Sequence, residues 1–292
     1  MTRDRLIDRS ERANGLTHHV VEHPGAGRTP VLLLHGYLDL ARSFTGVITR
    51  LGDAGHRVCA PDFRGHGDSA RVPEGAYYHF PDYLADIAGL LDALSLERPH
   101  VVAHSMGGSV ATMLASVLPS RVRSLTLIEG LGPPAMPPEV TPDRTALWLE
   151  GVAKVRARGA RRMASLDDVI ARMRMSNTDV PEAILREVAP YAVRATDDGG
   201  WVFRFDPLHQ TTSPSRFDAE GFEAYIARIT CPVLHVWGRA PEGFELYAKR
   251  ADLFANARRV IFEDAGHMIH WTRPDPLSAA LLSHFDDVER AG

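Results

Sequence analysis

The sequence predicts an α/β fold in which a mainly parallel sheet is covered by helices on both faces. Short apolar runs recur along the chain, which is typical of strands that are buried on both sides. Amphipathic segments separate these runs, and strands that alternate with helices in this way form parallel sheets. A length of 292 residues suits one such domain that carries an insertion.

The individual elements follow from the same patterns. The pair Asn14-Gly15 predicts a tight hairpin whose second arm covers residues 16–22. Strands are then expected at residues 31–34, 58–60, 100–102, 125–128, 232–237 and 260–262. The helices that alternate with them are expected at residues 43–54, 83–94, 109–115 and 244–254, with a final helix from Pro276.

A proline-rich stretch at residues 133–138 interrupts this alternation, because neither a helix nor a central strand can continue through it. Helices are expected after it at residues 145–158, 166–175 and 181–193, followed by an extended return at 201–205. Ser165 and Asp168 have the spacing of a capping box at the start of the second helix. We therefore predict core residues 1–131, a helical cap inserted at 132–213, and core residues 214–292.

The apolar residues of this predicted cap are expected to form its core first and to line a pocket second. They include Trp148, Leu149, Met163, Met173 and Met175. The cap also carries a basic run, which we interpret mainly as a solvated helix face and alternatively as an attraction for an anionic substrate such as a coenzyme A thioester. Its members are Lys154, Arg156, Arg158, Arg161, Arg162, Arg172 and Arg174.

The composition is that of a soluble globular protein. Hydrophobic residues make up 45% and charged residues 24%, and the net charge of −4 lacks the basic footprint of nucleic-acid binding. The first five residues have no apolar core of a secretory signal, and no apolar run approaches the roughly 18 residues of a membrane span. We expect a cytoplasmic protein that binds neither nucleic acid nor membranes, with buried free thiols at Cys59 and Cys231. The oligomeric state stays open.

The most informative stretch is Ala103-His104-Ser105-Met106-Gly107. An apolar run leads into it and a helix-like run follows, which is the strand, sharp turn and helix of a nucleophile elbow. Small residues two positions on either side of the serine allow strand and helix to approach. Ala103 stands where glycine is usual, and its side chain still fits. Ser105 is therefore the predicted nucleophile, and His104 is assigned to the pocket wall or to packing.

A serine hydroxyl needs a base to remove its proton. His267 follows the last predicted strand, in the chain order serine, acid, histidine that is typical of this arrangement. His270 is the nearest rival, although it lies on the way to the final helix. We predict His267 as the base.

The acid that orients this histidine has several candidates. Glu129 ends the apolar run at residues 125–128, where a carboxylate can reach the histidine and hold its tautomer. After residues 233–237 the chain has Pro241 in place of a carboxylate, and Glu242 follows it as the alternative acid. Two further alternatives stay open: that Asp264 is the acid, or that the site has no acid.

Two backbone N–H groups are expected to form an oxyanion hole. Met106 directly follows the nucleophile and supplies one of them. Gly36 permits an unusual backbone angle that can turn the Tyr37 N–H inward to supply the other. We interpret His35 as a brace for this loop.

The remaining histidine- and glycine-rich segments do not predict a cofactor or a metal ion. Residues 62–69 lack the lysine and the spacing of a nucleotide-binding loop, and we interpret them as a self-bonded turn that shapes one wall of the site. His18 and His19 alternate faces of a strand, and we expect no role for them. No group of His, Cys and carboxylates has metal-site spacing.

Taken in order, four motifs resemble the α/β-hydrolase superfamily: residues 35–37, residues 62–69, Ala-His-Ser-Met-Gly-Gly at 103–108 and Ala-Gly-His at 265–267. The resemblance implies an eight-stranded sheet and a Ser-His-acid triad. Displacement of the acid to Glu129 is similar to the arrangement in some haloalkane dehalogenases, but those carry an aspartate nucleophile. Ser105 therefore disfavours dehalogenase and epoxide hydrolase chemistry. Residues 201–208 also resemble a group of serine hydrolase-like proteins.

These residues predict hydrolysis of a carboxylic ester or thioester of a small to medium, partly apolar substrate through an acyl-enzyme. An alternative keeps the fold and the triad but uses them for C–C bond hydrolysis, lyase or perhydrolase chemistry. A third interpretation is a non-catalytic ligand-binding protein on the same fold, since fold alone does not decide function.

Overall fold

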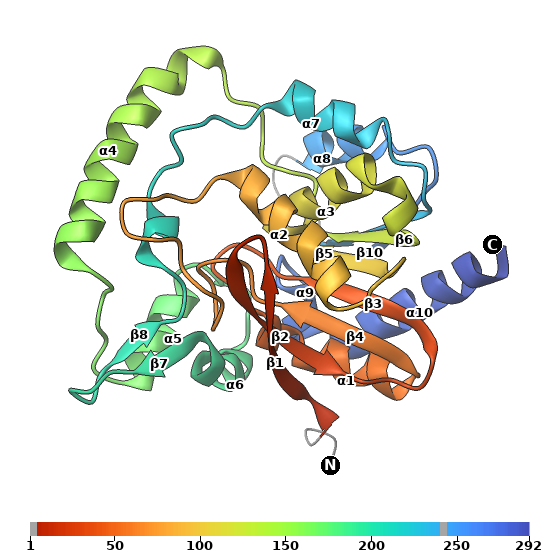
Figure 1. Cartoon of the computed structure of the whole chain (residues 1–292), viewed down its shortest axis with the longest axis horizontal. Coiled ribbons are helices and arrows are strands. Elements are labelled where there is room, and N and C mark those ends of the chain that lie inside the picture. Colours follow the sequence, from red (N-terminus) through yellow and green to blue (C-terminus); the bar gives the residue numbers. More distant parts are fainter. Residues whose placement is uncertain (1–4, 240–243, 292) are drawn as a thin grey trace.

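A mostly parallel sheet forms the centre of the computed structural model, which describes residues 5–239 and 244–291 (Figure 1). Within these residues the sheet has eight strands in the order β1-β2-β4-β3-β5-β6-β9-β10. They are β1 (Ile7–Ala13), β2 (Leu16–His23), β3 (Arg28–Leu34), β4 (His56–Pro61), β5 (His100–His104), β6 (Ser124–Ile128), β9 (Val233–Gly238) and β10 (Ala257–Phe262). Among the described pairs of this sheet, only β1–β2 and β2–β4 are antiparallel. The predicted fold class is confirmed.

The predicted hairpin joins β1 to β2. Asn14 and Gly15 have φ angles of 48° and 78°, and positive φ at both central residues is the signature of a type I′ turn. The register places Ala13 opposite Leu16, so the loop holds only these two residues.

Helices cover both faces of the sheet, because successive strand residues point to opposite sides. In β3, Leu32 and Leu34 face one buried cluster, whereas Val31 and Leu33 face the other. The first cluster is covered by α2 (Phe80–Ala93), α3 (Met106–Val117), α7 (Ala219–Ile226) and α8 (Phe244–Ala251). The second is covered by α1 (Thr45–Asp53), α9 (Ile269–Thr272) and α10 (Pro274–Ala291).

A long segment between β6 and β9 leaves the sheet and returns to it. It contains α4 (Thr141–Arg158), α5 (Leu166–Arg174), α6 (Glu182–Ala192) and a hairpin of β7 (Val193–Ala195) with β8 (Trp201–Phe203). The Ser165–Asp168 capping box is present at the start of α5. We call residues 132–213 the insertion. Short 3-10 turns lie at Ala41–Phe44, Pro119–Arg121, Pro138–Val140 and Pro207–Gln210.

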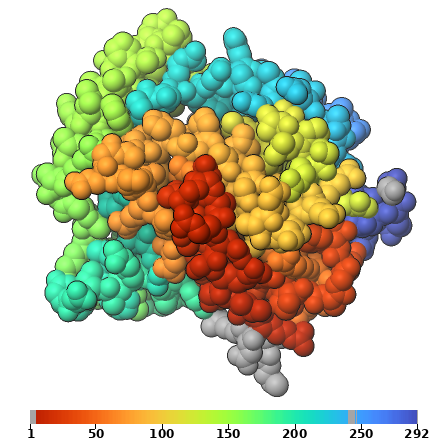
Figure 2. All heavy atoms as spheres, in the orientation of Figure 1, coloured from red at the N-terminus to blue at the C-terminus, as the bar shows by residue number. Residues whose placement is uncertain are grey.

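The insertion has its own small core, from which α4 is absent. Met163 and Met173 are buried in a cluster with residues of α5 and α6, as expected. The expectation for Leu149 and Met175 is wrong, because their exposed fractions are 58% and 69%. In α4 only Val152 is buried, and the helix runs along the outer edge of the molecule (Figures 1 and 2). Leu149 lies on this outer helix and Met175 directly follows α5, and both side chains face solvent instead of the core of the insertion.

Both cysteines are free and buried, as predicted. Burial raises the pKa of the Cys59 thiol to about 12, so this side chain stays protonated and unreactive near neutral pH. Across the described residues, no helix combines the length and the apolar character needed to cross a membrane.

Candidate active site

Ser105 occupies a strained turn between β5 and α3. Its φ and ψ are 49° and −116°, which a non-glycine residue rarely adopts. The Ser105 N–H donates to the carbonyl oxygen of Ile128 on the neighbouring strand at 2.9 Å. Strain of this kind persists only where the surroundings fix the backbone, and it gathers at functional sites.

Glycines near the turn make the close packing possible. A Cβ at Gly107 would lie 2.5 Å from the carbonyl oxygen of His35, in the loop that follows β3. A Cβ at Gly108 would lie 2.5 Å from the backbone oxygen of Gly130. Ala103 is fully buried, and its methyl group is accommodated in the core. The start of α3 therefore sits against two loops that leave β3 and β6.

Glu129 and His267 meet at the same edge of the sheet. Glu129 directly follows β6, has a φ of 52°, and places Oε2 3.7 Å from Nδ1 of His267. Its other oxygen, Oε1, accepts a 2.6 Å hydrogen bond from the N–H of Gly238 at the end of β9. The carboxylate thus reaches across the end of β9 to the loop after β10. Gly238 was not singled out from the sequence, although a glycine directly after an apolar strand was the available signal.

The rival residues are engaged elsewhere or lie outside the described part of the chain. Asp264 is exposed and pairs with Arg273 at 2.8 Å. His270 is buried and bonded to Asp39 at 3.1 Å. Glu242, the alternative acid, falls outside the described residues.

Ser105 and His267 are connected indirectly. Within residues 5–239 and 244–291, no hydrogen bond joins the serine hydroxyl to the imidazole, whose side chain is about half exposed at 51%. In enzymes without bound substrate such catalytic hydrogen bonds are often long or poorly aligned. His104 instead links the two loops, because its Nε2 lies 3.0 Å from the backbone oxygen of His267. The sequence assigned His104 only to the pocket wall or to packing.

The predicted oxyanion loop lies against the serine. A Cβ at Gly36 would lie 3.2 Å from Cβ of Ser105, so this glycine is needed for close approach. The expected unusual angle at Gly36 is wrong, because positive φ occurs at Leu38 instead, at 57°. Among the described residues, neither the Tyr37 N–H nor the Met106 N–H has a hydrogen-bond acceptor. Neither donor is therefore committed to another group in the described part of the chain.

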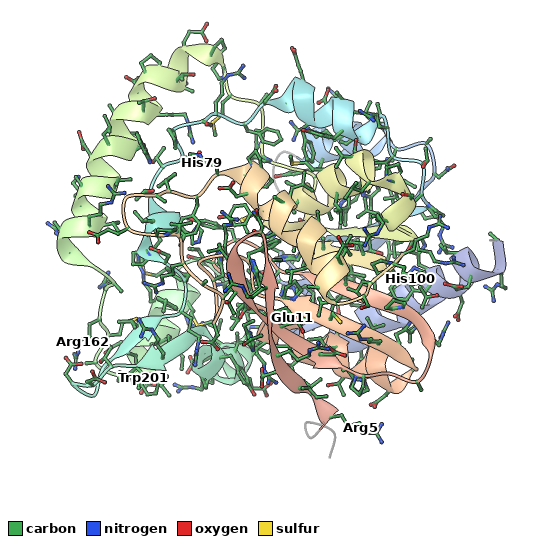
Figure 3. All side chains as sticks on the ribbon, viewed as in Figure 1. Arg5, Glu11, His79, His100, Arg162 and Trp201 are labelled. Carbon is green, nitrogen blue, oxygen red and sulfur yellow. The ribbon has the colours of Figure 1, made fainter. Side chains whose placement is uncertain are left out.

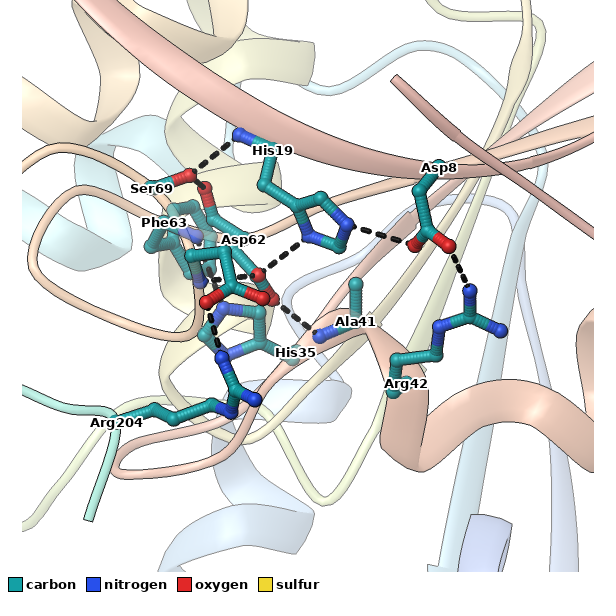
Figure 4. Close-up of polar contacts among 10 residues, drawn as sticks. Asp8, His19, His35, Ala41, Arg42, Asp62, Phe63, Ser69 and Arg204 are labelled. Carbon is teal, nitrogen blue, oxygen red and sulfur yellow. Dashed lines mark hydrogen bonds and ion pairs between the residues drawn. The ribbon is translucent and has the colours of Figure 1, made fainter. Parts of the chain in front are cut away.

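The turn at residues 62–69 is bonded to itself and to its neighbours, as predicted (Figure 4). The Asp62 carboxylate accepts from the N–H groups of Ala41 at 2.7 Å and Asp68 at 3.0 Å. Ser69 donates its hydroxyl to the Asp62 backbone oxygen at 2.6 Å. His35 is the expected brace: its Nε2 accepts from the N–H of Phe63 at 2.9 Å.

His18 and His19 have roles that the sequence did not indicate. The ring of His19 bridges Asp62 at 2.7 Å and Asp8 at 2.8 Å (Figure 4). Although burial opposes the charge, these two carboxylates raise the pKa of His19 to about 8. His18 is buried 3.7 Å from Asp86, and burial lowers its pKa. Only the fold brings the two histidines to these three carboxylates, so strand alternation alone could not reveal the contacts.

The basic run lies on the outer part of the insertion. Arg162 pairs with Asp198 at 2.6 Å, and Arg174 pairs with Glu182 at 2.8 Å. Figure 3 shows Arg162 beside Trp201 at a corner far from the labelled His100. An open hollow of about 370 Å³ lies there, lined by Arg161, Arg162, Met163, Ala164, Asp168, Ala171, Arg172 and Met175. Paired, exposed cations of this kind agree with a solvated face.

Asp39, His104 and His270 form a buried cluster beside the serine turn. Their ligand atoms lie within 4.8 Å of one another, and two histidines with a carboxylate are a donor set that suits a transition metal. The cluster already has internal hydrogen bonds, since one Asp39 oxygen is bonded to His270 and also accepts from Ser43 at 2.8 Å. We interpret it as polar packing that supports the loops around it.

Comparisons with known proteins identify the fold family. The family described as alpha/beta hydrolase fold matches residues 29–274. A serine hydrolase-like protein from Danio rerio is 33% identical over 191 residues, which is 63% of this chain and 56% of that protein. Epoxide hydrolase A from Mycobacterium tuberculosis is 29% identical over 98% of both chains. A hypothetical protein from Pseudomonas aeruginosa PAO1 has a similar structure, with a TM-score of 0.81, 25% identity, and coverage of 96% and 98%.

Proposed function

Because the chain belongs to the alpha/beta hydrolase fold family, we propose that it hydrolyses a carboxylic ester or thioester through Ser105, His267 and Glu129. The observation that carries the proposal is the strained serine at the strand–helix turn. A histidine and a carboxylate 3.7 Å apart at the same sheet edge support it. The substrate is proposed to be a small to medium, partly apolar molecule, and the reaction uses no cofactor.

The reaction proceeds in two acyl transfers. Ser105 Oγ attacks the carbonyl carbon while His267 takes its proton, and the tetrahedral intermediate collapses as His267 protonates the departing alcohol or thiol. Water then attacks the acyl-enzyme, again with His267 as base, which releases the acid and restores the serine. Glu129 holds the imidazole in one orientation and stabilises its charged form.

The negative oxygen of each intermediate is assigned to the N–H groups of Tyr37 and Met106. Both are free of other acceptors among the described residues, and the Gly36 loop touches Ser105. One such donor lowers the activation free energy by roughly 3–4 kcal/mol, so the pair is as important as the acid of the triad.

The epoxide hydrolase relative suggests a different reaction, which the nucleophile argues against. A carboxylate that opens an epoxide forms an ester, and water can then hydrolyse that ester. Attack by Ser105 would instead form an ether, which has no carbonyl group for water to attack. The serine therefore favours acyl transfer over epoxide opening.

Fluorophosphonate labelling tests the proposal, because these probes react with activated serines. We expect wild-type protein to be labelled on the peptide that contains Ser105, and Ser105→Ala to remain unlabelled. Ser109→Ala, which removes a serine one turn further along α3, should be labelled like wild type. Equal labelling of wild type and Ser105→Ala would end the proposal.

A substrate panel separates the ester or thioester reaction from the alternatives with the same triad. Activated esters and acyl thioesters should be turned over, whereas dienoic diketones, the substrates of C–C hydrolysis, should not. Faster turnover of a dienoic diketone than of any ester would favour the second chemistry. Tight ligand binding without turnover of any substrate would favour a binding protein.

A further inference from the structure

His104 lies between the two loops that carry the proposed nucleophile and base. It is the last residue of β5, directly before Ser105, and its side chain is buried. Its Nε2 lies 3.0 Å from the backbone oxygen of His267, and the two ring centroids are 4.7 Å apart. One side chain thus connects the serine turn with the backbone of the base.

The direction of this hydrogen bond follows from the charge of the ring. Burial holds the pKa of His104 well below its ordinary value, so the imidazole is neutral. A carbonyl oxygen can only accept, and the single ring proton therefore lies on Nε2 and is donated to His267. The other nitrogen, Nδ1, lies against Gly36, where a Cβ would be only 2.6 Å away. The oxyanion loop thus covers the remaining edge of the ring.

A second set of side chains fixes the far side of the His104 ring. The ring of His270 lies 4.4 Å from it, centroid to centroid. His270 is held in turn by the Asp39 carboxylate at 3.1 Å and by stacking on Phe44 at 4.3 Å. His104 therefore has little freedom to change its rotamer.

We propose that His104 is a positioning residue that holds the His267 loop at a fixed place relative to Ser105. This proposal rests on the proposed function, since it concerns the same pair of groups. His267 is half exposed and, within the described residues, has no hydrogen bond to Ser105. The tether restrains the His267 backbone, which the Glu129 contact with the side chain does not reach. A misplacement of about 1 Å can cost on the order of 100-fold in rate.

A matched pair of variants tests the tether. His104→Gln keeps an N–H donor near the position of Nε2, whereas His104→Met has a similar length and no donor. With a p-nitrophenyl ester, we expect His104→Met to lower kcat by roughly 10- to 100-fold while KM changes by less than about 2-fold. His104→Gln should recover most of the lost kcat.

His56→Met provides the control for a merely structural loss. His56 is also buried and also bonds a backbone carbonyl, that of Thr29 at 2.7 Å. It is the first residue of β4, however, and so lies at the opposite end of the parallel strands from Ser105. Its replacement should lower Tm by an amount similar to that of His104→Met and leave kcat unchanged. A loss of kcat as large as in His104→Met would overturn the tether, and so would equal kcat values for His104→Met and His104→Gln.

A backbone substitution keeps the test valid if His104→Met does not fold. Replacing Met268 by its α-hydroxy acid turns the carbonyl of His267 into an ester carbonyl, which is a weaker acceptor. We expect kcat to fall while fluorophosphonate still labels Ser105, and an unchanged kcat would overturn the tether. Labelling of the wild type reports the proposed function separately: an unlabelled wild type would overturn that function, whereas a labelled wild type with unaffected variants overturns only the tether.

Discussion

The sheet domain and the insertion bury their side chains very differently. The sheet has a continuous buried cluster on each face, and helices cover both. In the insertion, α5, α6 and the β7–β8 hairpin share one smaller cluster, whereas α4 leaves Leu147 and Leu149 exposed. All the proposed catalytic groups lie on loops of the sheet. We therefore propose that the densely packed region holds the chemistry and that the insertion selects the substrate.

The two regions meet beside the proposed site. Met268, next to His267, belongs to the buried cluster of the insertion. The Tyr37 hydroxyl donates to the backbone oxygen of His209 at 2.5 Å, and Tyr78 donates to Asp206 at 2.9 Å. A movement of the insertion would therefore act on the loop of the proposed base through Met268 and on the proposed oxyanion loop through Tyr37.

The largest expected effect is on turnover when the acid at the sheet edge is removed. Glu129→Gln keeps an oxygen that can accept from Gly238 but loses the negative charge facing His267. We expect kcat to fall by at least ~100-fold, because the imidazole loses the group that orients and stabilises it. Steady-state kinetics with a p-nitrophenyl ester measure this loss.

Asp264→Asn and Glu242→Gln are the matched controls for this prediction. Asp264 is a carboxylate near the same loop, but it pairs with Arg273, so its loss should leave kcat close to wild type. A greater loss in Glu242→Gln than in Glu129→Gln would move the acid to Glu242.

The next largest effect contrasts the cores of the two regions. Phe285 is fully buried and stacks on His100 with centroids 4.1 Å apart. Phe285→Ala should cost about 3–5 kcal/mol of unfolding free energy, because a cavity replaces the ring. Leu149→Ala, on exposed α4, should stay within about 0.5 kcal/mol. Urea unfolding measures both, and similar losses would contradict the difference in packing described above.

A smaller effect depends on pH and belongs to the sheet domain. The pKa of His19 is about 8 in the folded protein, above the ordinary 6.5, so its pairing stabilises the protein fully below about pH 6.5. This contribution, about 2 kcal/mol from the difference between the two values, is lost as pH rises through 8. Urea unfolding at pH 6 and pH 9 should show the decline in wild type and much less of it in His19→Gln. The control His79→Gln, at an exposed histidine, should show the same decline between pH 6 and pH 9 as wild type.

The smallest effect concerns the start of α5 in the insertion. The Ser165 side chain accepts a 3.1 Å hydrogen bond from the Asp168 N–H. Ser165→Ala should lower the unfolding free energy by about 1 kcal/mol, whereas Ser176→Ala, at an exposed serine nearby, should change it by less than about 0.5 kcal/mol. Thermal unfolding measures both variants. Equal Tm values for Ser165→Ala and Ser176→Ala would mean that the insertion contributes less to the cooperative unfolding transition than the sheet does.

Much of the sheet domain could be predicted because its signals are local. An apolar run such as residues 31–34 predicts a strand that is buried on both faces, and the pair Asn14-Gly15 predicts a tight turn without information from the rest of the chain. The exposure of Leu149 could not be predicted in this way. An apolar residue on an amphipathic helix indicates a buried face only where another surface covers it, and the sequence does not say that α4 lies at the outer edge.

The site shows the same division between local and distant signals. The residues around Ser105 carry a local motif, and the chain order indicates Glu129 and His267. The contacts that hold these groups join residues far apart in sequence, such as Gly238 with Glu129 and His104 with His267. Such pairs depend on which strand ends lie side by side, which only the folded sheet decides.

The most direct test of the central claim is to trap the acyl group on the protein. Wild-type protein mixed rapidly with p-nitrophenyl acetate should release a burst of nitrophenol of about one equivalent, and peptide mapping of acid-quenched protein should find the acetyl group on Ser105. Hydrolysis of the ester with the acetyl group found only on another residue would contradict Ser105 as the nucleophile.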